Sequence, residues 1–354
     1  MIRLARRSLV LLVLATLLTA CGGDDSASTT SAAAGGDTTT AAAGGDSIKV
    51  GLVTDIGGLN DRSFNHLAYL GLQRAQKQLG VEGRAVTSKA NSDYVPNLSA
   101  LARQDYDLVI AVGFLMADAI DTVAKRYPDT SFAIIDFPWE ALKSKPKNVV
   151  GLIFKQEQAG YLTGYLAGLI QKEQGMPRTK PGDVVASVGG QKIPPVETYI
   201  AGFQAGAKAA DPGVKTLNQY SNDFVDQAKC KEIALNQITQ GADAVIQVAG
   251  GCGLGALDAA REKGVWGIGA DADQAYLGPY ILTSALKKVD VSVFNASKSV
   301  QDGSFAGGKS VVFDVKNGGI GIGKISPEVP EALVDEVMKV KDDIASGKIE
   351  VPAS

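Results

Sequence analysis

The clearest indication of the fold in this sequence is KVGLVTDIGGLNDRSFNHLAYLGLQRAQKQLG, which spans Lys49–Gly80. It opens with Lys49–Val53, a short run rich in valine and leucine that is typical of a buried strand. Apolar side chains then recur at helical spacing from Phe64 to Leu79, and the glycine that follows is a helix stop. A polar loop with two glycines lies between these segments. The stretch therefore predicts a strand, a loop and a helix.

The same alternation continues along the chain. Further apolar runs are predicted as strands at Asp107–Val112, Phe132–Ile135, Val149–Phe154, Val184–Val188, Ala244–Val248 and Val265–Ile268. Amphipathic stretches predict helices between most of them, at Leu115–Tyr127, Gln158–Gln171, Val196–Ala210, Val225–Thr239 and Leu254–Lys263. Apolar strands that alternate with helices indicate an α/β fold whose parallel sheets are covered on both faces.

The strands are too numerous for one small sheet, so we predict two doubly wound parallel-sheet lobes joined by a hinge. The first lobe is expected to hold about residues 47–154 and 288–315, and the second about 155–287 and the C-terminal segment. Val149–Phe154 is the expected first crossing between the lobes, and Ile281–Lys287 the second.

The N-terminus has the layout of a secretory signal peptide over residues 1–20. Three arginines precede Ser8–Leu18, an apolar run that is too short for a spanning helix of about 20 residues. Leu18–Cys21 is similar to the bacterial lipobox, which makes Cys21 the expected lipidated first residue of the mature chain. The alternative is an ordinary signal peptide with an incidental cysteine. Residues 22–46 contain only Gly, Asp, Ala, Ser and Thr, so we expect a disordered tether before a folded domain at 47–354.

Charge and composition exclude several classes of function. Loss of residues 1–20 removes three of the 35 Lys and Arg residues and none of the 38 Asp and Glu residues, which leaves a net charge of about −6. An acidic chain disfavours nucleic acid and polybasic binding to membranes. His66 is the only histidine, so we expect no histidine-based metal site or catalytic triad and no cofactor.

Residues that follow the predicted strands point to a cleft. In doubly wound sheets, ligands bind beyond the carboxyl ends of the strands. Polar, glycine-rich and aromatic segments occupy those positions here, at Thr54–Asn65, Gly113–Phe114, Asp136, Gly189–Gly190, Ser221–Phe224, Gly250–Gly253 and Asp271–Gln274. The sequence therefore predicts a binding cleft between two facing lobes.

Five segments, taken in order, match the pattern of one known family: Thr54–Asn65, Tyr127–Asp136, Tyr161–Gly168, Gly267–Gln274 and Thr283–Lys287. On these segments the chain resembles the basic membrane protein (PnrA-like) family, lipoproteins that bind purine nucleosides for uptake transporters. The resemblance runs from Ile48 to the C-terminus. It implies the type I periplasmic-binding-protein fold, which agrees with the two lobes predicted from the strand pattern.

The resemblance also implies which residues hold the ligand base. Asp55 and Asn65 would form hydrogen bonds with the base, and Phe64 would form one stacking wall. Phe224 falls at the position of the second stacking aromatic residue. Because Phe64 opens an amphipathic helix, a core position is its alternative. The chain departs from the family at His66, where glutamine is common.

Ribose contacts are implied for Asp136, Asp271 and Lys287, and a shift of one residue would place Lys288 there instead. Carboxylates accept strong hydrogen bonds from hydroxyl groups. The alternative for each aspartate is a helix cap or a turn residue. Several carboxylates against one lysine would repel phosphate, so a nucleoside is favoured over a nucleotide.

The implied function is nucleoside capture at the extracytoplasmic face of the cell membrane. The lobes would close on a nucleoside, expected to be a purine, and deliver it to the permease and ATPase subunits of an ABC importer. We expect a monomer held to the membrane by its lipid. Two alternatives stay open: the same fold could bind a sugar or another solute, or the protein could be a surface adhesin. An enzyme is disfavoured, because nucleoside hydrolysis would need a metal cluster that these residues do not supply.

Two cysteines remain after Cys21, and both depart from the small residues expected of the family. Cys230 lies in the first turns of a predicted helix, and Cys252 just follows the next strand. A helix that leads into a strand places its start beside the strand's end, so we predict a Cys230–Cys252 disulfide at the cleft edge. It would close a loop of about 22 residues and hold the loop that carries Phe224. Separate buried thiols are the alternative.

Overall fold

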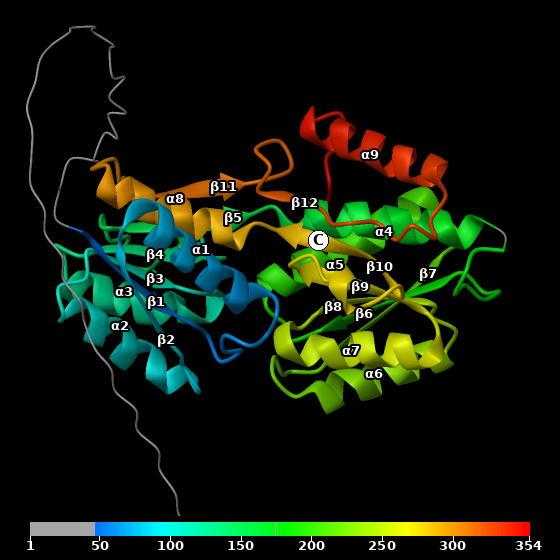
Figure 1. The fold of residues 1–354 in the computed structure, drawn as a ribbon, viewed down its shortest axis with the longest axis horizontal. Coiled ribbons are helices and arrows are strands. Elements are labelled where there is room, and N and C mark those ends of the chain that lie inside the picture. Colours follow the sequence, from blue (N-terminus) through cyan, green and yellow to red (C-terminus); the bar gives the residue numbers. More distant parts are fainter. Residues whose placement is uncertain (1–46, 174) are drawn as a thin grey trace, which may run out of the picture. The chain divides into compact units, whose positions relative to one another are not determined.

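The computed structural model describes residues 47–173 and 175–354, which form one compact unit. The predicted signal peptide, Cys21 and the predicted tether lie outside these residues. Within the described part, two six-stranded sheets lie side by side, with helices on both faces of each (Figure 1). The prediction of an α/β fold with two doubly wound lobes is confirmed.

The first sheet has the strand order β11-β5-β4-β3-β1-β2, and every neighbouring pair is parallel. Its strands are β1 (Lys49–Val53), β2 (Glu82–Val86), β3 (Leu108–Ala111), β4 (Ser131–Ile135), β5 (Val149–Phe154) and β11 (Lys309–Phe313). Buried side chains alternate between the faces of each central strand. One face packs on α1 (Phe64–Leu79) and α8 (Val289–Gln301), and the other on α2 (Tyr94–Ala102) and α3 (Ala117–Arg126).

The second sheet repeats this plan with the order β12-β10-β9-β8-β6-β7. Its strands are β6 (Val184–Gly189), β7 (Lys215–Tyr220), β8 (Ala244–Val248), β9 (Trp266–Asp271), β10 (Ile281–Lys287) and β12 (Ile320–Ile322). The last strand is antiparallel to β10. Helices α4 (Gln156–Lys172) and α5 (Pro194–Ala210) cover one face, and α6 (Gln227–Thr239) and α7 (Gly250–Lys263) the other.

The chain passes between the sheets three times, after β5, after β10 and after β11. The last passage leads to β12 and then to α9 (Glu331–Ala345), which packs on α4. In the second lobe, α4 and α5 approach so closely that a side chain on Gly164 would overlap the carbonyl of Phe203. The crossings bring the carboxyl ends of both sheets to one cleft.

Some elements differ from the predictions. Strands β2, β11 and β12 and helices α2, α8 and α9 were not predicted, and of β7 only the end before Ser221 was. Helix α7 begins at Gly250, one turn before the predicted Leu254, although glycine disfavours helix interiors. By contrast, α1 spans the predicted residues, and Gly80 ends it in the left-handed conformation at φ 72°.

Candidate functional site

A pocket lies between the lobes, at the carboxyl ends of strands from both sheets. Its empty space is about 600 Å³, including the open mouth. All seven predicted site residues line it: Asp55, Phe64, Asn65 and Asp136 from the first lobe, and Phe224, Asp271 and Lys287 from the second. The structure therefore brings these side chains together, while their contacts with a ligand stay a prediction. Lys288 is not among the lining residues.

The loop before α1 is held by one carboxylate. Asp61 accepts hydrogen bonds from the backbone N–H groups of Ser63, Asn65 and His66, at 3.1, 2.8 and 3.0 Å. It also accepts one from the side-chain amide of Asn65 at 3.1 Å. These bonds satisfy donors that the start of a helix leaves free. Asp61 therefore fixes the first turn of α1, which carries Phe64 and Asn65.

Asn65 in turn orients Asp55. Its side-chain N–H groups bind Oδ1 of Asp55 at 2.8 Å and Oδ2 of Asp61 at 3.1 Å, and its Oδ1 accepts the Asp55 N–H at 3.2 Å. Gly57 N–H also binds Oδ1 of Asp55 at 2.8 Å. The second oxygen, Oδ2, lies beside Gly113, whose φ of 122° leaves the position to glycine. Both Asn65 donors are thus committed within the protein, and Oδ2 of Asp55 accepts no hydrogen bond from residues 47–173 and 175–354.

Burial raises the pKa of Asp55 to about 6. The hydrogen bonds from Gly57 and Asn65 lower that pKa, and the neighbouring carboxylates Asp61 and Asp136 raise it. Desolvation outweighs the hydrogen bonds because the side chain is almost wholly removed from water.

Asp136 and Lys287 form a buried ion pair between the lobes. Oδ2 of Asp136 lies 2.5 Å from Nζ of Lys287, and the two side chains are only 5% and 3% exposed. The ammonium also lies 4.9 Å from the ring centroid of Phe64 and 5.2 Å from that of Phe154. Oδ1 of Asp136 is buried and has no hydrogen-bond partner among residues 47–173 and 175–354. An unpaired buried acceptor is costly, and a ligand hydroxyl group would satisfy it.

Two of the site aspartates occupy equivalent places in the two sheets. Asp136 directly follows β4 with φ 66°, and Asp271 ends β9 with φ 62°. Strands β4 and β9 hold the same position in their sheet orders. Aspartate tolerates the left-handed conformation better than most residues, although it is still uncommon there. Such backbone strain is typical of functional sites.

Asp271 contacts the opposite lobe through Ser63. The hydroxyl Oγ of Ser63 lies 2.8 Å from Oδ2 of Asp271 and 3.0 Å from the carbonyl of Ala270, and its one hydrogen serves one acceptor at a time. Burial raises the pKa of Asp271 to about 6; Lys287 and Ser63 lower it, and Asp136 and Asp61 raise it. Ser63 and Asp271 thus join the lobes at the pocket wall.

The aromatic residues come from different lobes. Phe64 stands in the first turn of α1, and Phe224 in the loop between β7 and α6; both are half-buried. Gly190 follows β6 directly against the Phe224 ring, and a side chain there would overlap that ring. Because Gly190 has no side chain, the ring of Phe224 can pack against it. Glycine at this position agrees with the glycine-rich segments that follow the predicted strands.

Several lining residues were not predicted. Tyr199 of α5 is buried at the pocket and donates a hydrogen bond from its hydroxyl group to the carbonyl of Ala285 at 2.8 Å. Burial raises the pKa of Tyr199 well above its ordinary value. Ile193, Pro195 and Val196, at the start of α5, form an apolar part of the lining. The amphipathic pattern predicted this helix, but not which of its ends borders the pocket.

The site can therefore offer carboxylate acceptors, one paired ammonium group and aromatic faces. Within residues 47–173 and 175–354, no three His, Cys, Asp or Glu side chains are grouped as metal ligands. The helices of this same part include none with the length and apolar character needed to cross a membrane. A neutral ligand with several hydrogen-bond donors and a flat face would suit the carboxylates, the paired ammonium group and the aromatic faces of this site.

Comparison with known proteins gives the family. Residues 48–354 match the model of the Bmp family, described as ABC transporter substrate-binding protein PnrA-like. The ABC transporter nucleoside-binding protein BmpA of Lactococcus lactis is 34% identical over 328 residues, covering 86% of this chain and 89% of that protein. Basic membrane protein A of Borreliella burgdorferi is 30% identical, covering 86% of this chain and 88% of its own length.

A solved structure shows the same fold. The solute-binding protein of an ABC transporter system from Aeropyrum pernix K1 superposes with a TM-score of 0.77 at 28% identity, covering 87% of this chain and 94% of that one. The two lobes, the pocket between them and the family match agree. This chain is a member of the Bmp family of PnrA-like ABC transporter substrate-binding proteins.

Proposed function

We propose that this substrate-binding protein captures a purine nucleoside at the outer face of the cell membrane and delivers it to the permease and ATPase subunits of an ABC importer. The observation that carries the proposal is the pocket itself, where aromatic side chains and aspartate carboxylates from both lobes converge. The relative from Lactococcus lactis, named as nucleoside-binding, supports it. Lipid on Cys21 would hold the protein at the membrane, and the intact mass of membrane-extracted protein would reveal the acyl groups.

The proposed pose assigns each side of the pocket to one part of a nucleoside. The base stacks between Phe64 and Phe224, and Oδ2 of Asp55 accepts an N–H from it. The free Oδ1 of Asp136 and the carboxylate of Asp271 accept ribose hydroxyl groups. Lys287, already paired with Asp136, has little capacity left for a phosphate, so nucleotides are rejected.

A screen of small molecules by thermal shift tests this proposal. A ligand that binds only the folded state stabilises the protein by about 2.7 kcal/mol when its concentration is 100 times its Kd. We expect inosine, guanosine and adenosine to raise the melting temperature, and pyrimidine nucleosides, free sugars and nucleotides to raise it less or not at all. A response to sugars alone would favour a sugar-binding protein, and no response would favour a surface adhesin. Free base released from inosine would instead indicate an enzyme.

Closure of the lobes follows from the proposed pose, because the ligand would contact residues of both lobes at once. A ligand that makes more contacts in the closed arrangement shifts the population toward it. We expect small-angle scattering of residues 47–354 to show a smaller radius of gyration at saturating nucleoside. An unchanged scattering profile under conditions where calorimetry confirms binding would contradict a hinged mechanism.

Affinity and stability should respond to pH in opposite directions. Asp55 and Asp271 have pKa values of about 6, raised from 3.8 by burial, so protonation favours the folded state. The free energy of unfolding of the ligand-free protein should therefore rise as pH falls from 8 to 5, by about 1 kcal/mol for each carboxyl group. Nucleoside donors need the ionised carboxylates, so the Kd should increase over the same range.

Urea titrations and calorimetry at several pH values measure the two trends. Asp55→Asn keeps the shape of the side chain and removes one titrating group, so it should flatten the pH dependence of stability. A Kd that is constant from pH 8 to 5 would argue against carboxylate contacts with the ligand.

A further inference from the structure

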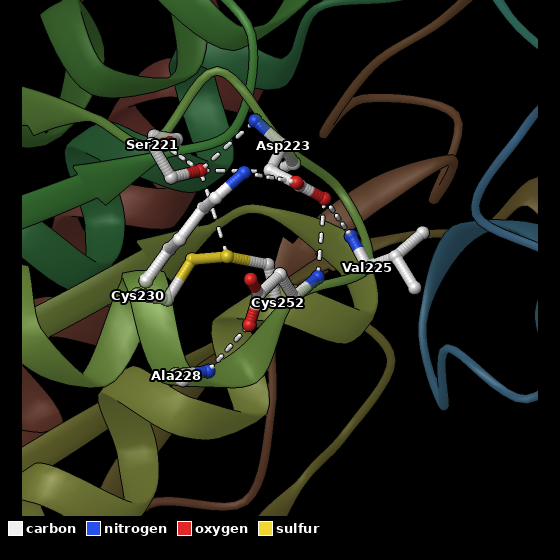
Figure 2. Close-up of polar contacts among 9 residues, drawn as sticks. Ser221, Asp223, Val225, Ala228, Cys230 and Cys252 are labelled. Carbon is white, nitrogen blue, oxygen red and sulfur yellow. Dashed lines mark hydrogen bonds and ion pairs between the residues drawn. A yellow bond between two sulfur atoms is a disulfide. The ribbon is translucent and has the colours of Figure 1, made fainter.

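A disulfide joins α6, which follows the Phe224 loop, to α7, whose first turn contacts that loop, as the sequence predicts. Cys230 lies in α6 and Cys252 in the first turn of α7, with their Cα atoms 5.5 Å apart and a separation of 22 in sequence. Both residues are fully buried. Figure 2 shows the bridge directly beneath the segment Ser221–Asp226, here called the wall loop, which carries Phe224.

The start of the wall loop is tied to the second sheet and to the bridge. The backbone N–H of Ser221 binds the carbonyl of Gly189 at 2.8 Å, and that of Asn222 binds the carbonyl of Gly190 at 3.1 Å. Oγ of Ser221 lies 2.8 Å from the carbonyl of Asp223 and 3.5 Å from Sγ of Cys252. Ser221 therefore stands between the sheet edge and the disulfide.

The rest of the wall loop is closed by one carboxylate. Asp223 accepts the backbone N–H groups of Val225 at 2.8 Å and Asp226 at 3.1 Å, and the ammonium group of Lys229 at 2.7 Å (Figure 2). These partners, Lys229 foremost, lower the pKa of Asp223 to about 2, which keeps it ionised. Asp226 then caps α6 by accepting the N–H of Ala228 at 3.0 Å.

The main chain of Phe224 contacts one of the two bridged cysteines. Its carbonyl accepts a hydrogen bond from the backbone N–H of Cys252 at 3.0 Å, so one half-cystine fixes the main chain of the aromatic residue. The turn that contains Cys252 is otherwise weak, because it is built from Gly250, Gly251 and Gly253, and glycine loses the most backbone freedom on ordering. The disulfide links this turn covalently to α6.

We propose that the Cys230–Cys252 disulfide is a positioning device that sets the Phe224 wall of the pocket before ligand arrives. The bridge anchors the glycine-rich first turn of α7, this turn holds the Phe224 carbonyl, and the ring is held against Gly190 at the pocket. The ligand then binds to a wall that is already ordered, so the entropic cost of ordering this wall does not reduce the affinity. The proposal rests on the proposed function for its ligand, although the order of the wall loop can be measured without one.

The test compares residues 47–354, which contain all the buried clusters, with the Cys230→Ala/Cys252→Ala variant. Hydrogen exchange of the ligand-free proteins is the first measurement. We expect amide exchange in 221–229 and 250–254 to be at least about tenfold faster without the bridge. Leu98→Ala creates a cavity in the fully buried core beneath α2. This variant is the control for a general loss of stability, and amide exchange in its wall loop should stay slow.

The second measurement is a double-mutant cycle on inosine affinity. Removing the bridge should weaken binding about 2- to 10-fold when Phe224 is present, and by less than about twofold in the Phe224→Ala background. Unchanged exchange in the wall loop, or an equal loss of affinity in both backgrounds, would overturn the proposal. If the unaltered protein binds no nucleoside, the proposed function fails, and the exchange measurement alone still decides whether the bridge orders the wall.

Discussion

Replacing Lys287 with methionine should lower the free energy of unfolding of the ligand-free protein by about 3–5 kcal/mol. The ammonium group is 3% exposed and is paired with Asp136, which is 5% exposed. Without its partner, the Asp136 carboxylate would stay in a site that burial and other carboxylates already make unfavourable for negative charge. Urea denaturation of residues 47–354 at pH 7 measures the change.

A double variant separates the lost charge from lost packing. Asp136→Asn/Lys287→Met removes both charges of the pair, and asparagine tolerates the φ of 66° at this position. We therefore expect the double variant to recover most of the stability that Lys287→Met loses. If the two variants are equally unstable, the packing of the lysine stem, and not the ion pair, is what matters here.

Loss of either aromatic wall should weaken nucleoside binding by about 1–3 kcal/mol, because stacking on an aromatic face contributes that much for each base. We expect this for both Phe64→Ala and Phe224→Ala, measured by calorimetry with inosine. The double variant should show the largest loss of affinity, since the walls come from different lobes and contact different faces of the base.

Two controls sharpen the aromatic test. Tyr276→Ala removes an aromatic side chain that is 62% exposed and outside the pocket lining, and it should bind as the unaltered protein does. Phe224→Leu retains apolar bulk without a flat face, so it should fall between phenylalanine and alanine. Unaltered affinity in both Phe→Ala variants would show that these residues are not the walls.

The fold could be predicted from the sequence where each segment carries a strong local pattern. Lys49–Gly80 is such a segment, since a buried strand, a glycine-containing loop and an amphipathic helix follow in order, and the structure keeps these bounds. Helix α8 was missed because its valine, serine and asparagine residues are poor helix formers, and packing against α1 decides its conformation. Strand β2 was missed because it lies at the edge of its sheet, where none of its residues is buried.

The predicted site depended on one physical rule, that the carboxyl ends of parallel strands meet at a cleft. This rule and the family resemblance predicted that Asp55, Asp136 and Asp271 lie in one cleft, and all three line the pocket. The rule does not tell which polar groups will bind each other instead of a ligand. Asn65 shows the difference, because its amide is committed to Asp55 and Asp61, and only the folded geometry reveals this.

The pairing of Cys230 with Cys252 could be predicted because the helix start and the strand end lie side by side in this topology. Tyr199 could not, because its role in the pocket depends on how α5 is rotated against the second sheet. Periodicity predicts that a helix has a buried face. It does not predict which buried residue reaches the cleft.

Calorimetric titration of ligand-stripped protein, residues 47–354, measures directly whether the pocket binds a purine nucleoside. Inosine, guanosine, adenosine and uridine are titrated in turn at pH 7.5, followed by inosine monophosphate. We expect saturable binding of one purine nucleoside per chain, and binding of uridine and of the nucleotide that is weaker by about tenfold or more, a difference of about 1.4 kcal/mol. Heat signals no larger than dilution for all three purine nucleosides would contradict it.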